Sequence, residues 1–243
     1  MIGAGPGDPE LLTIKALKAM RAADVVLYDH LVSHAVLDEL PKTTELICVG
    51  KRSSNHTLPQ AEIGLLLIEL ARQGKNVVRL KGGDGYIFGR GGEEAEVVAA
   101  AGVALSVIPG LTAAQGAAAA CGIPLTHRDH AQALVLVTGH LRENKSVDLD
   151  WDLLARPNQT VVIYMGMGTL ETICRELQAH GLDGHTSAAL VENATLDSQR
   201  CITGTVDTLP ALAQCHGVRP PALIMIGGVV SVRDVLFPEP LEV

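Results

Sequence analysis

Aromatic residues are scarce in this sequence. One Trp, three Tyr and two Phe occur among 243 residues, although hydrophobic residues as a whole make up 47% of the chain. A core of this composition must be filled mainly by Val, Ile, Leu and Ala. Such cores are typical of α/β proteins, whose central strands are buried on both faces. The length allows one large domain or two smaller ones.

Other absences disfavour whole classes of function. No apolar run approaches the ~18 to 20 residues that span a bilayer, and the N-terminus has no basic stretch, apolar run and cleavage site in series. The formal net charge of −8 argues against general affinity for nucleic acids or anionic membranes. The five cysteines form no CxxC pair, which favours ordinary reduced thiols. We therefore expect a cytoplasmic protein with no metal, nucleic-acid or membrane partner.

Segments typical of strands and of helices alternate through the first half of the chain. Helical periodicity at 10–22, 60–73 and 91–101 separates short apolar runs, which predict strands at 23–28, 45–49, 76–80 and 105–108. This alternation favours crossover units and a mostly parallel sheet.

The second half has shorter spacings between its predicted strands. After a linker at 109–112, segment 113–121 is almost entirely small residues and predicts a helix that allows close backbone approach. Helices are expected at 170–180 and 208–215, and strands at 133–138, 160–165, 187–191 and 222–226. Hairpin-like spacing favours a mixed sheet here. We predict two α/β domains, 1–110 and 111–243, with a ligand cleft between them.

A glycine-rich turn, Gly3 to Asp8 (GAGPGD), opens the chain after only two residues, which leaves a larger parent protein open. It is close to the dinucleotide fingerprint GxGxxG, with Asp29 as the ribose ligand, so a dinucleotide-dependent oxidoreductase is one alternative. However, Asp8 replaces the third glycine, and its carboxylate would repel a pyrophosphate at the helix N-terminus. A helix-capping role for Asp8 is the better interpretation.

A second glycine-rich loop runs from Lys81 to Glu94 (KGGDGYIFGRGGEE), after a predicted strand and before a predicted helix. Its glycines would let the backbone wrap closely around a ligand. No Gly-Lys-Ser/Thr closes the loop, so it is not a P-loop. A flexible surface turn would leave the apolar Ile87 and Phe88 unexplained. Asp84 could shape the turn or accept hydrogen bonds from the ligand.

Ten motifs in order carry a family resemblance over nearly the whole chain. They are GAGPGDPELLT (3–13), ADVVLYD (23–29), VGKR (49–52), KGGD (81–84), FGRGGEE (88–94), PGLTAA (109–114), GIPLTHRD (122–129), VTGH (137–140), YMG (164–166) and VEN (191–193). With them the sequence resembles the tetrapyrrole methylases. FGRGGEE, GIPLTHRD and VTGH are similar to those members that act on uroporphyrinogen III.

The resemblance implies a homodimer of two-domain α/β subunits, with S-adenosylmethionine held between the domains as methyl donor. It implies C-methylation of uroporphyrinogen III, twice, through precorrin-1 to precorrin-2, in sirohaem, cobalamin or d-type haem biosynthesis. S-adenosylhomocysteine would be the second product. A related methylase with another acceptor, or a module that binds a tetrapyrrole without chemistry, stays open.

The resemblance also assigns site residues. Donor contacts fall on Pro6, Gly82, Gly83, Asp84, Ile87, Thr112, Ala113, Met165 and Ala194. Catalytic roles fall on Asp29, Lys51, Arg90 and Glu93, and substrate contacts on Arg90, Arg128, His140 and Met165. The sequence departs from the family at Gly85, where Pro is usual, and at Ala194, where Gly is usual.

Simple chemistry agrees with these roles. Methylation of an electron-rich pyrrole carbon requires a proton to leave, so a base such as Asp29 or Glu93 is useful. Uroporphyrinogen III is a polyanion, and its carboxylates call for several cations. Candidates follow predicted strands or the linker, where ligands bind in α/β sheets: Lys51, Arg52, Lys81, Arg90, His127, Arg128 and His140.

Overall fold

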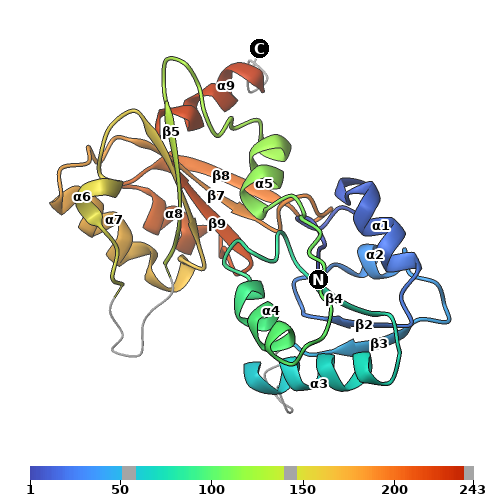
Figure 1. Ribbon diagram of the computed structural model, residues 1–243. Coiled ribbons are helices and arrows are strands. Elements are labelled where there is room, and N and C mark those ends of the chain that lie inside the picture. Colours follow the sequence, from blue (N-terminus) through green and yellow to red (C-terminus); the bar gives the residue numbers. More distant parts are fainter. Residues whose placement is uncertain (51–58, 140–146, 238–243) are drawn as a thin grey trace. The chain divides into compact units, whose positions relative to one another are not determined.

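The computed structural model describes residues 1–50, 59–139 and 147–237. The chain divides into two compact units, Met1–Ala113 and Ala114–Val243 (Figure 1). Each unit is built on one β-sheet, and the first sheet is entirely parallel whereas the second is mixed. The predicted fold class, two α/β sheets of these two kinds, is confirmed.

The sheet of the first unit has the strand order β1-β4-β2-β3. Its strands are β1 (Ile2–Gly3), β2 (Val25–Tyr28), β3 (Glu45–Cys48) and β4 (Val77–Lys81). The helices are α1 (Ile14–Arg21), α2 (His34–Leu37), α3 (Gln60–Arg72) and α4 (Gly91–Ala100), with a 3-10 turn at Pro9–Leu11. Asp8 caps that turn by accepting from the Glu10 N–H at 2.8 Å, as expected of a capping residue.

The two faces of this sheet are covered by different helices, because alternate side chains of a strand point to opposite faces. On one face Val26 and Leu80 pack with Met20 of α1. On the other face Leu27 packs with Leu67 of α3 and Val98 of α4. The aliphatic residues that dominate the composition thus fill both layers.

The second sheet has the order β5-β6-β9-β7-β8, and only β5 and β6 are parallel neighbours. Its strands are β5 (Ala133–Thr138), β6 (Gln159–Tyr164), β7 (Ser187–Glu192), β8 (Arg200–Thr205) and β9 (Ala222–Ile226). The remaining helices are α5 (Ala113–Cys121), α6 (Trp151–Leu154), α7 (Leu170–Ala179), α8 (Leu209–Cys215) and α9 (Val232–Leu236), with 3-10 turns at Met167–Thr169 and Gly228–Ser231.

Some details differ from the sequence prediction. The prediction of a strand at 105–108 is wrong. Of these residues Ile108 alone pairs with a strand, through an isolated bridge to Ile2, because the two-residue β1 is too short to pair with a whole strand. Strand β8 was not predicted, since its polar and glycine-containing sequence lacks a clear apolar alternation. Among the cysteines, for which ordinary thiols in mostly apolar surroundings were expected, Cys121 and Cys174 are buried whereas Cys48 and Cys215 are exposed. Among the described residues no helix is long and apolar enough to cross a membrane.

Candidate active site

Three backbone segments of the first unit meet at glycines. The Ala4 N–H donates to the Lys81 carbonyl at 2.7 Å, and the Gly83 N–H donates to the Gly5 carbonyl at 2.7 Å. A Cβ on Gly110 would lie 2.4 Å from the Gly83 oxygen and 2.7 Å from the Gly3 carbonyl. A Cβ on Gly3 would likewise lie 2.5 Å from the Gly110 nitrogen, and Gly83 has the left-handed φ of 65°, which side chains disfavour. Gly3, Gly83 and Gly110 together form the glycine junction. The junction therefore presents bare backbone beside the carboxyl ends of β1 and β4, where α/β sheets bind ligands.

Asp84 stabilises the glycine junction through two hydrogen bonds. One carboxylate oxygen accepts from the Gly110 N–H at 3.0 Å, and the other accepts from the Tyr86 N–H at 2.8 Å. These bonds show the turn-shaping role, one of the two roles left open by the sequence. Contact between Asp84 and a methyl donor stays a prediction.

Left-handed backbone at non-glycine residues concentrates in the motifs. Of the six such residues in the described chain, five lie in or beside donor and substrate motifs: Phe88, Arg90, Met165, Asn193 and Thr195. A positive φ costs free energy in a residue with a Cβ and persists where surrounding structure enforces it, often at functional sites. In the first unit Tyr86, Ile87 and Phe88 also expose apolar side chains next to the glycine junction.

The second unit contains the other two predicted donor residues. Met165 follows β6 directly, has φ of 54° and is 52% exposed. The hydroxyl of the preceding Tyr164 accepts from the Ala114 N–H at 3.0 Å, which ties the start of α5 to the end of β6. Ala194 lies in the turn after β7 between two left-handed residues. Ala194 itself has no left-handed φ, so alanine in place of the usual glycine causes no backbone strain.

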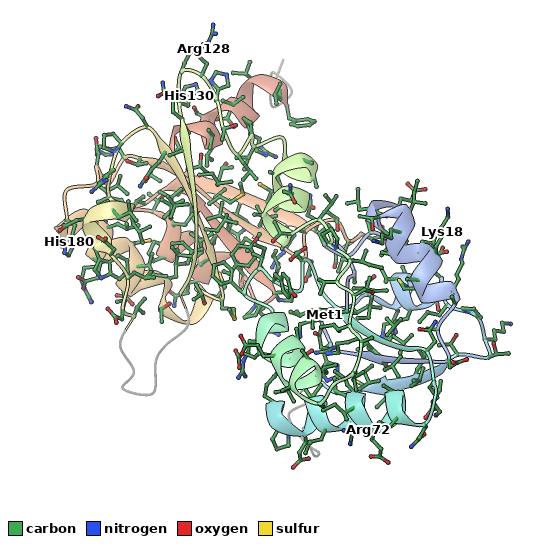
Figure 2. All side chains as sticks on the ribbon, viewed as in Figure 1. Met1, Lys18, Arg72, Arg128, His130 and His180 are labelled. Atoms are coloured by element: carbon green, nitrogen blue, oxygen red, sulfur yellow. The ribbon has the colours of Figure 1, made fainter. Side chains whose placement is uncertain are left out.

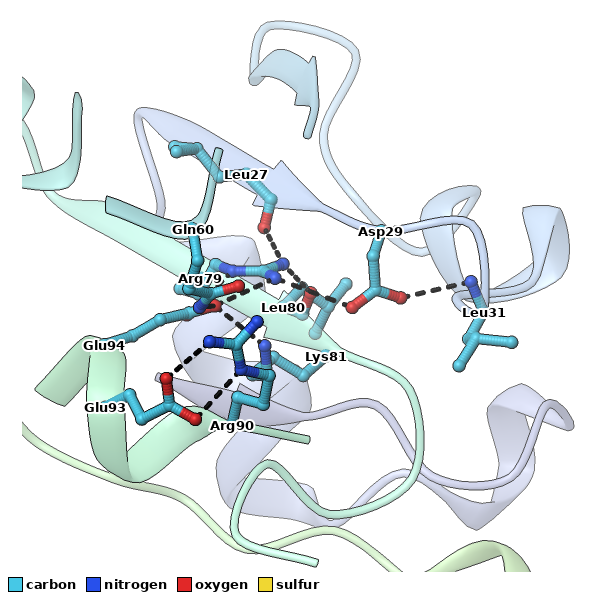
Figure 3. Close-up of polar contacts among 10 residues, drawn as sticks. All are labelled: Leu27, Asp29, Leu31, Gln60, Arg79, Leu80, Lys81, Arg90, Glu93 and Glu94. Carbon is cyan, nitrogen blue, oxygen red and sulfur yellow. Dashed lines mark hydrogen bonds and ion pairs between the residues drawn. The ribbon is translucent and has the colours of Figure 1, made fainter. Parts of the chain in front are cut away.

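Arg90 and Glu93 form an exposed ion pair at the start of α4 (Figure 3). Arg90 Nη2 lies 2.6 Å from one Glu93 oxygen, and Nε donates to the other at 2.9 Å. The hydrogen bond to Arg90 lowers the pKa of Glu93, and the same bond raises the pKa of Arg90. Both side chains are therefore charged at neutral pH and open to solvent, so an anionic ligand that binds Arg90 would compete with Glu93.

A buried charged cluster lies behind this pair on the α3–α4 face of the first sheet (Figure 3). Glu94 accepts from Arg79 Nε at 3.0 Å, from Lys81 Nζ at 2.9 Å and from Gln60 Nε2 at 2.9 Å. The Glu94 side chain is 1% exposed, and those of Arg79 and Lys81 are 5% and 6% exposed. Asp29 reaches the edge of the cluster, with Oδ2 3.6 Å from Arg79 Nη2.

Burial and the neighbouring charges together shift the pKa values in this cluster. Burial would raise the pKa of Glu94, but Arg79 and Lys81 outweigh it, so the pKa is lowered below its ordinary value of 4.5. Burial, helped by the charge of Arg79, lowers the pKa of Lys81 below 10.5 against the opposing effect of Glu94. Glu94 is thus the shared counter-ion of two buried cations.

The cluster corrects one sequence prediction and adds two residues. Lys81 was expected among the cations that face the substrate, yet it is buried and paired with Glu94. Arg79 and Glu94 were not predicted as site residues. The signal was present in the strand: Arg79 and Lys81 alternate with apolar residues, so both point to one face, and two buried cations require a buried anion nearby.

The remaining predicted substrate residues are placed only in part. Arg128 is exposed in the loop between α5 and β5, and Figure 2 shows its side chain projecting away from that loop. The rings of His127 and His130 in the same loop lie 4.8 Å apart. Lys51, Arg52 and His140 lie outside the described residues.

Glycine loops at the carboxyl ends of parallel strands define an α/β protein that binds a small molecule. The family is shown by comparison: residues 1–210 match the model of the Tetrapyrrole (Corrin/Porphyrin) Methylases, and the chain belongs to this family.

Curated relatives are siroheme synthases. The chain is 53% identical over 236 residues to that of Nitrosomonas europaea, which covers 97% of the chain and 50% of the relative. It is 54% identical over 236 residues to that of Ectopseudomonas mendocina, covering 97% of the chain and 51% of the relative. The chain thus spans about half the length of the curated relatives it matches.

Solved structures agree in fold over nearly the whole chain. Uroporphyrin-III C-methyl transferase from Thermus thermophilus, complexed with S-adenyl homocysteine, is 40% identical with a TM-score of 0.79, covering 95% of this chain and 92% of that one. A cobalt precorrin-4 methyltransferase is 29% identical with a TM-score of 0.83, covering 94% of each chain. This chain is therefore similar to solved methyltransferases over 94–95% of its length.

Proposed function

We propose that this chain transfers methyl groups from S-adenosylmethionine to two carbon atoms of uroporphyrinogen III, which gives precorrin-2. The observation that carries the proposal is the glycine junction, because the loop that supplies Gly83 of KGGD continues into the exposed charged pair of FGRGGEE. The similarity to a uroporphyrin-III C-methyl transferase supports the acceptor, and its complex with S-adenyl homocysteine supports the donor. Further activities of the longer siroheme synthases are outside the proposal.

The residues present fit a methyl donor. Bare backbone at Gly82 and Gly83 and the exposed apolar Ile87 suit a ligand with both polar and apolar parts, and Gly83 has the left-handed φ of 65°. We assign the donor to these residues together with Pro6, Asp84, Thr112, Ala113, Met165 and Ala194. When bound, S-adenosylmethionine supplies an electrophilic methyl group on a sulfonium, so the protein need only align the acceptor and exclude water.

The charged residues then serve the acceptor. Arg90 is exposed and binds the Glu93 carboxylate through Nε and Nη2, so an acetate or propionate of the porphyrinogen would replace Glu93 at the same two atoms. Arg128 is exposed and adds a second cation for the same purpose. Asp29, partly exposed at the end of β2, is the assigned proton acceptor for the methylated ring, with Glu93 as the second candidate.

The loop GAGPGD disfavours the oxidoreductase alternative. A pyrophosphate binds at the N-terminus of a long helix, where free N–H groups and the helix dipole converge. Here GAGPGD leads into a three-residue 3-10 turn, and Asp8 already occupies the N–H of Glu10. Titration with NAD and with S-adenosylhomocysteine separates the two functions, because binding of NAD alone would contradict methyl transfer.

The direct test is methyl transfer from labelled S-adenosylmethionine to enzymatically generated uroporphyrinogen III. The expected product is two methyl groups heavier by mass spectrometry, with a singly methylated species at early times. Light scattering on the active sample tests the further proposal of a homodimer, which rests on the family resemblance. Binding of S-adenosylhomocysteine without any methyl transfer would reject this acceptor and retain the methylase assignment.

Replacing Arg90 by Ala is expected to lower kcat/KM for uroporphyrinogen III about ten- to a hundredfold. That range corresponds to one lost charge-assisted hydrogen bond pair of about 1.5–3 kcal/mol. Affinity for S-adenosylhomocysteine, measured by calorimetry, should not change. Arg175→Ala is the matched control, because Arg175 is also exposed and paired with a glutamate, Glu176, at 2.9 Å, but lies on α7. Unchanged turnover in Arg90→Ala would remove Arg90 from the site.

A further inference from the structure

The carboxylate of Asp29 is held from two sides. Its Oδ1 accepts from the Leu31 N–H at 3.1 Å, and its Oδ2 faces Arg79 Nη2 at 3.6 Å (Figure 3). The Asp29 side chain is 23% exposed, whereas that of Arg79 is 5% exposed. Asp29 is thus the point at which the buried charged cluster reaches the ligand side of the sheet.

Arg79 itself has almost no freedom. Its Nε donates to Glu94 Oε2 at 3.0 Å, and its Nη1 donates to the Leu80 carbonyl at 2.9 Å and to that of Leu27 at 3.5 Å. Its Nη2 lies 3.3 Å from Glu94 Oε1. A planar guanidinium bound on three sides has one orientation, and that orientation directs Nη2 at Asp29.

The strand register explains why these groups meet. Leu27 of β2 pairs with Arg79 of β4, so Asp29, two residues beyond Leu27, projects from the same face as Arg79 and Lys81. Apolar side chains cover the earlier part of that face, and charged ones replace them only at the carboxyl ends of the strands.

The charges of the buried cluster balance when Asp29 is counted with Arg79, Lys81 and Glu94. Arg79 and Lys81 bring two positive charges into the interior, and Glu94 neutralises only one of them. The remaining positive charge is matched by Asp29. A low-dielectric interior strengthens this attraction, so the cluster draws the Asp29 carboxylate inward to one position.

The geometry points to Arg79 as a positioning residue, which together with Glu94 fixes the Asp29 carboxylate for its proton transfer. The inference rests on the proposed function for the role of Asp29, but the placement of Asp29 by Arg79 does not depend on it. The competing interpretation is that Arg79 only neutralises Glu94.

A double-mutant cycle separates the two interpretations. Arg79→Lys keeps the charge beside Glu94 but cannot bridge to Asp29, and Asp29→Asn removes the carboxylate that Arg79 would position. We expect Arg79→Lys to lower kcat about tenfold with the KM for S-adenosylmethionine unchanged. In the Asp29→Asn background the same change should alter kcat by less than about twofold. An equal loss in both backgrounds, or no loss in either, would overturn the inference.

Two further variants support the cycle, one as a control and one as a replacement. Arg21→Lys is the matched control, because Arg21 pairs with Glu39 at 2.7 Å on the exposed surface and should leave kcat unchanged. If Arg79→Lys does not fold, Glu94→Asp replaces it in the cycle, since the shorter carboxylate draws the guanidinium away from Asp29 while the charge is kept.

A crystal structure of the positioning variant is the readout that needs no turnover. With the Leu31 N–H left to hold Oδ1, the Asp29 carboxylate should turn Oδ2 away from its position beside residue 79, and an unmoved carboxylate would overturn the inference. Absence of methyl transfer by the unmodified protein would instead reject the proposed function and leave this structural result standing.

Discussion

Replacing Glu94 by Gln is expected to lower the free energy of unfolding by about 3–5 kcal/mol. Glutamine has nearly the same shape but no charge, so Arg79 and Lys81 would lose the buried carboxylate that both of them bind. Removing one partner of a buried ion pair is costly because the desolvation of the other is no longer offset. Urea titration followed by circular dichroism measures the change, with the denaturant dependence checked for two-state behaviour.

Glu93→Gln is the matched control for this prediction. Glu93 is the neighbouring residue on α4 with the same chemistry, but its side chain is 56% exposed and that of Glu94 is 1% exposed. The control should leave the midpoint of the urea titration essentially unchanged. Equal midpoints for the two variants would show that the buried cluster contributes nothing to stability.

The pH dependence of the Glu94 effect has a defined sign. Because the pKa of Glu94 is lowered in the folded protein, its stabilisation is fully present above its ordinary value of 4.5 and is lost as the pH falls through the lower folded value. The difference between the unmodified protein and Glu94→Gln should therefore shrink in acid. The same difference in stability should also become smaller at alkaline pH. Burial lowers the pKa of Lys81, so this side chain loses its proton there and no longer needs a counter-ion.

Replacing Gly110 by Ala is expected to weaken binding of S-adenosylhomocysteine at least tenfold and to cost about 1–3 kcal/mol of stability. The added Cβ would lie 2.4 Å from the Gly83 oxygen and 2.7 Å from the Gly3 carbonyl carbon. Both neighbours are backbone, so neither can turn aside as a side chain could. The junction would have to open, and it carries the loop assigned to the donor. Calorimetry gives the affinity and thermal unfolding gives the stability.

Gly92→Ala controls for the loss of a glycine as such. A Cβ on Gly92 meets nothing within 4 Å, and Gly92 lies within α4 without a left-handed φ. Alanine is the better helix former, so stability should stay the same or rise by up to about 1 kcal/mol. If Gly110→Ala bound the ligand as well as Gly92→Ala does, the glycine junction would have no role in donor binding.

Local patterns in the sequence determined much of the fold. Helix α3 and strands β5 and β9 agree closely with prediction, since apolar periodicity and flanking turn residues are properties of short segments. The prediction failed where pairing decides the outcome: residues 105–108 have the composition of a strand but too short a partner in β1. Strand β8 forms despite its weak pattern, because β7 supplies six paired residues.

The candidate site, like the fold, was predicted from the sequence only in part. The order of the motifs GAGPGD, KGGD and PGLTAA was enough to indicate the family and the glycine loops, because motif identity and order are read directly from the sequence. Sequence could not say which of Glu93 and Glu94 is buried, since neighbours on a helix point about 100° apart and only the packing of α4 on β4 selects one. Nor could it join Asp29 to Arg79, which parallel strand register brings together across fifty residues of chain. Sequence supplies the chemical groups and their local conformation, whereas the free energy of burying charge depends on contacts that only the folded sheet creates.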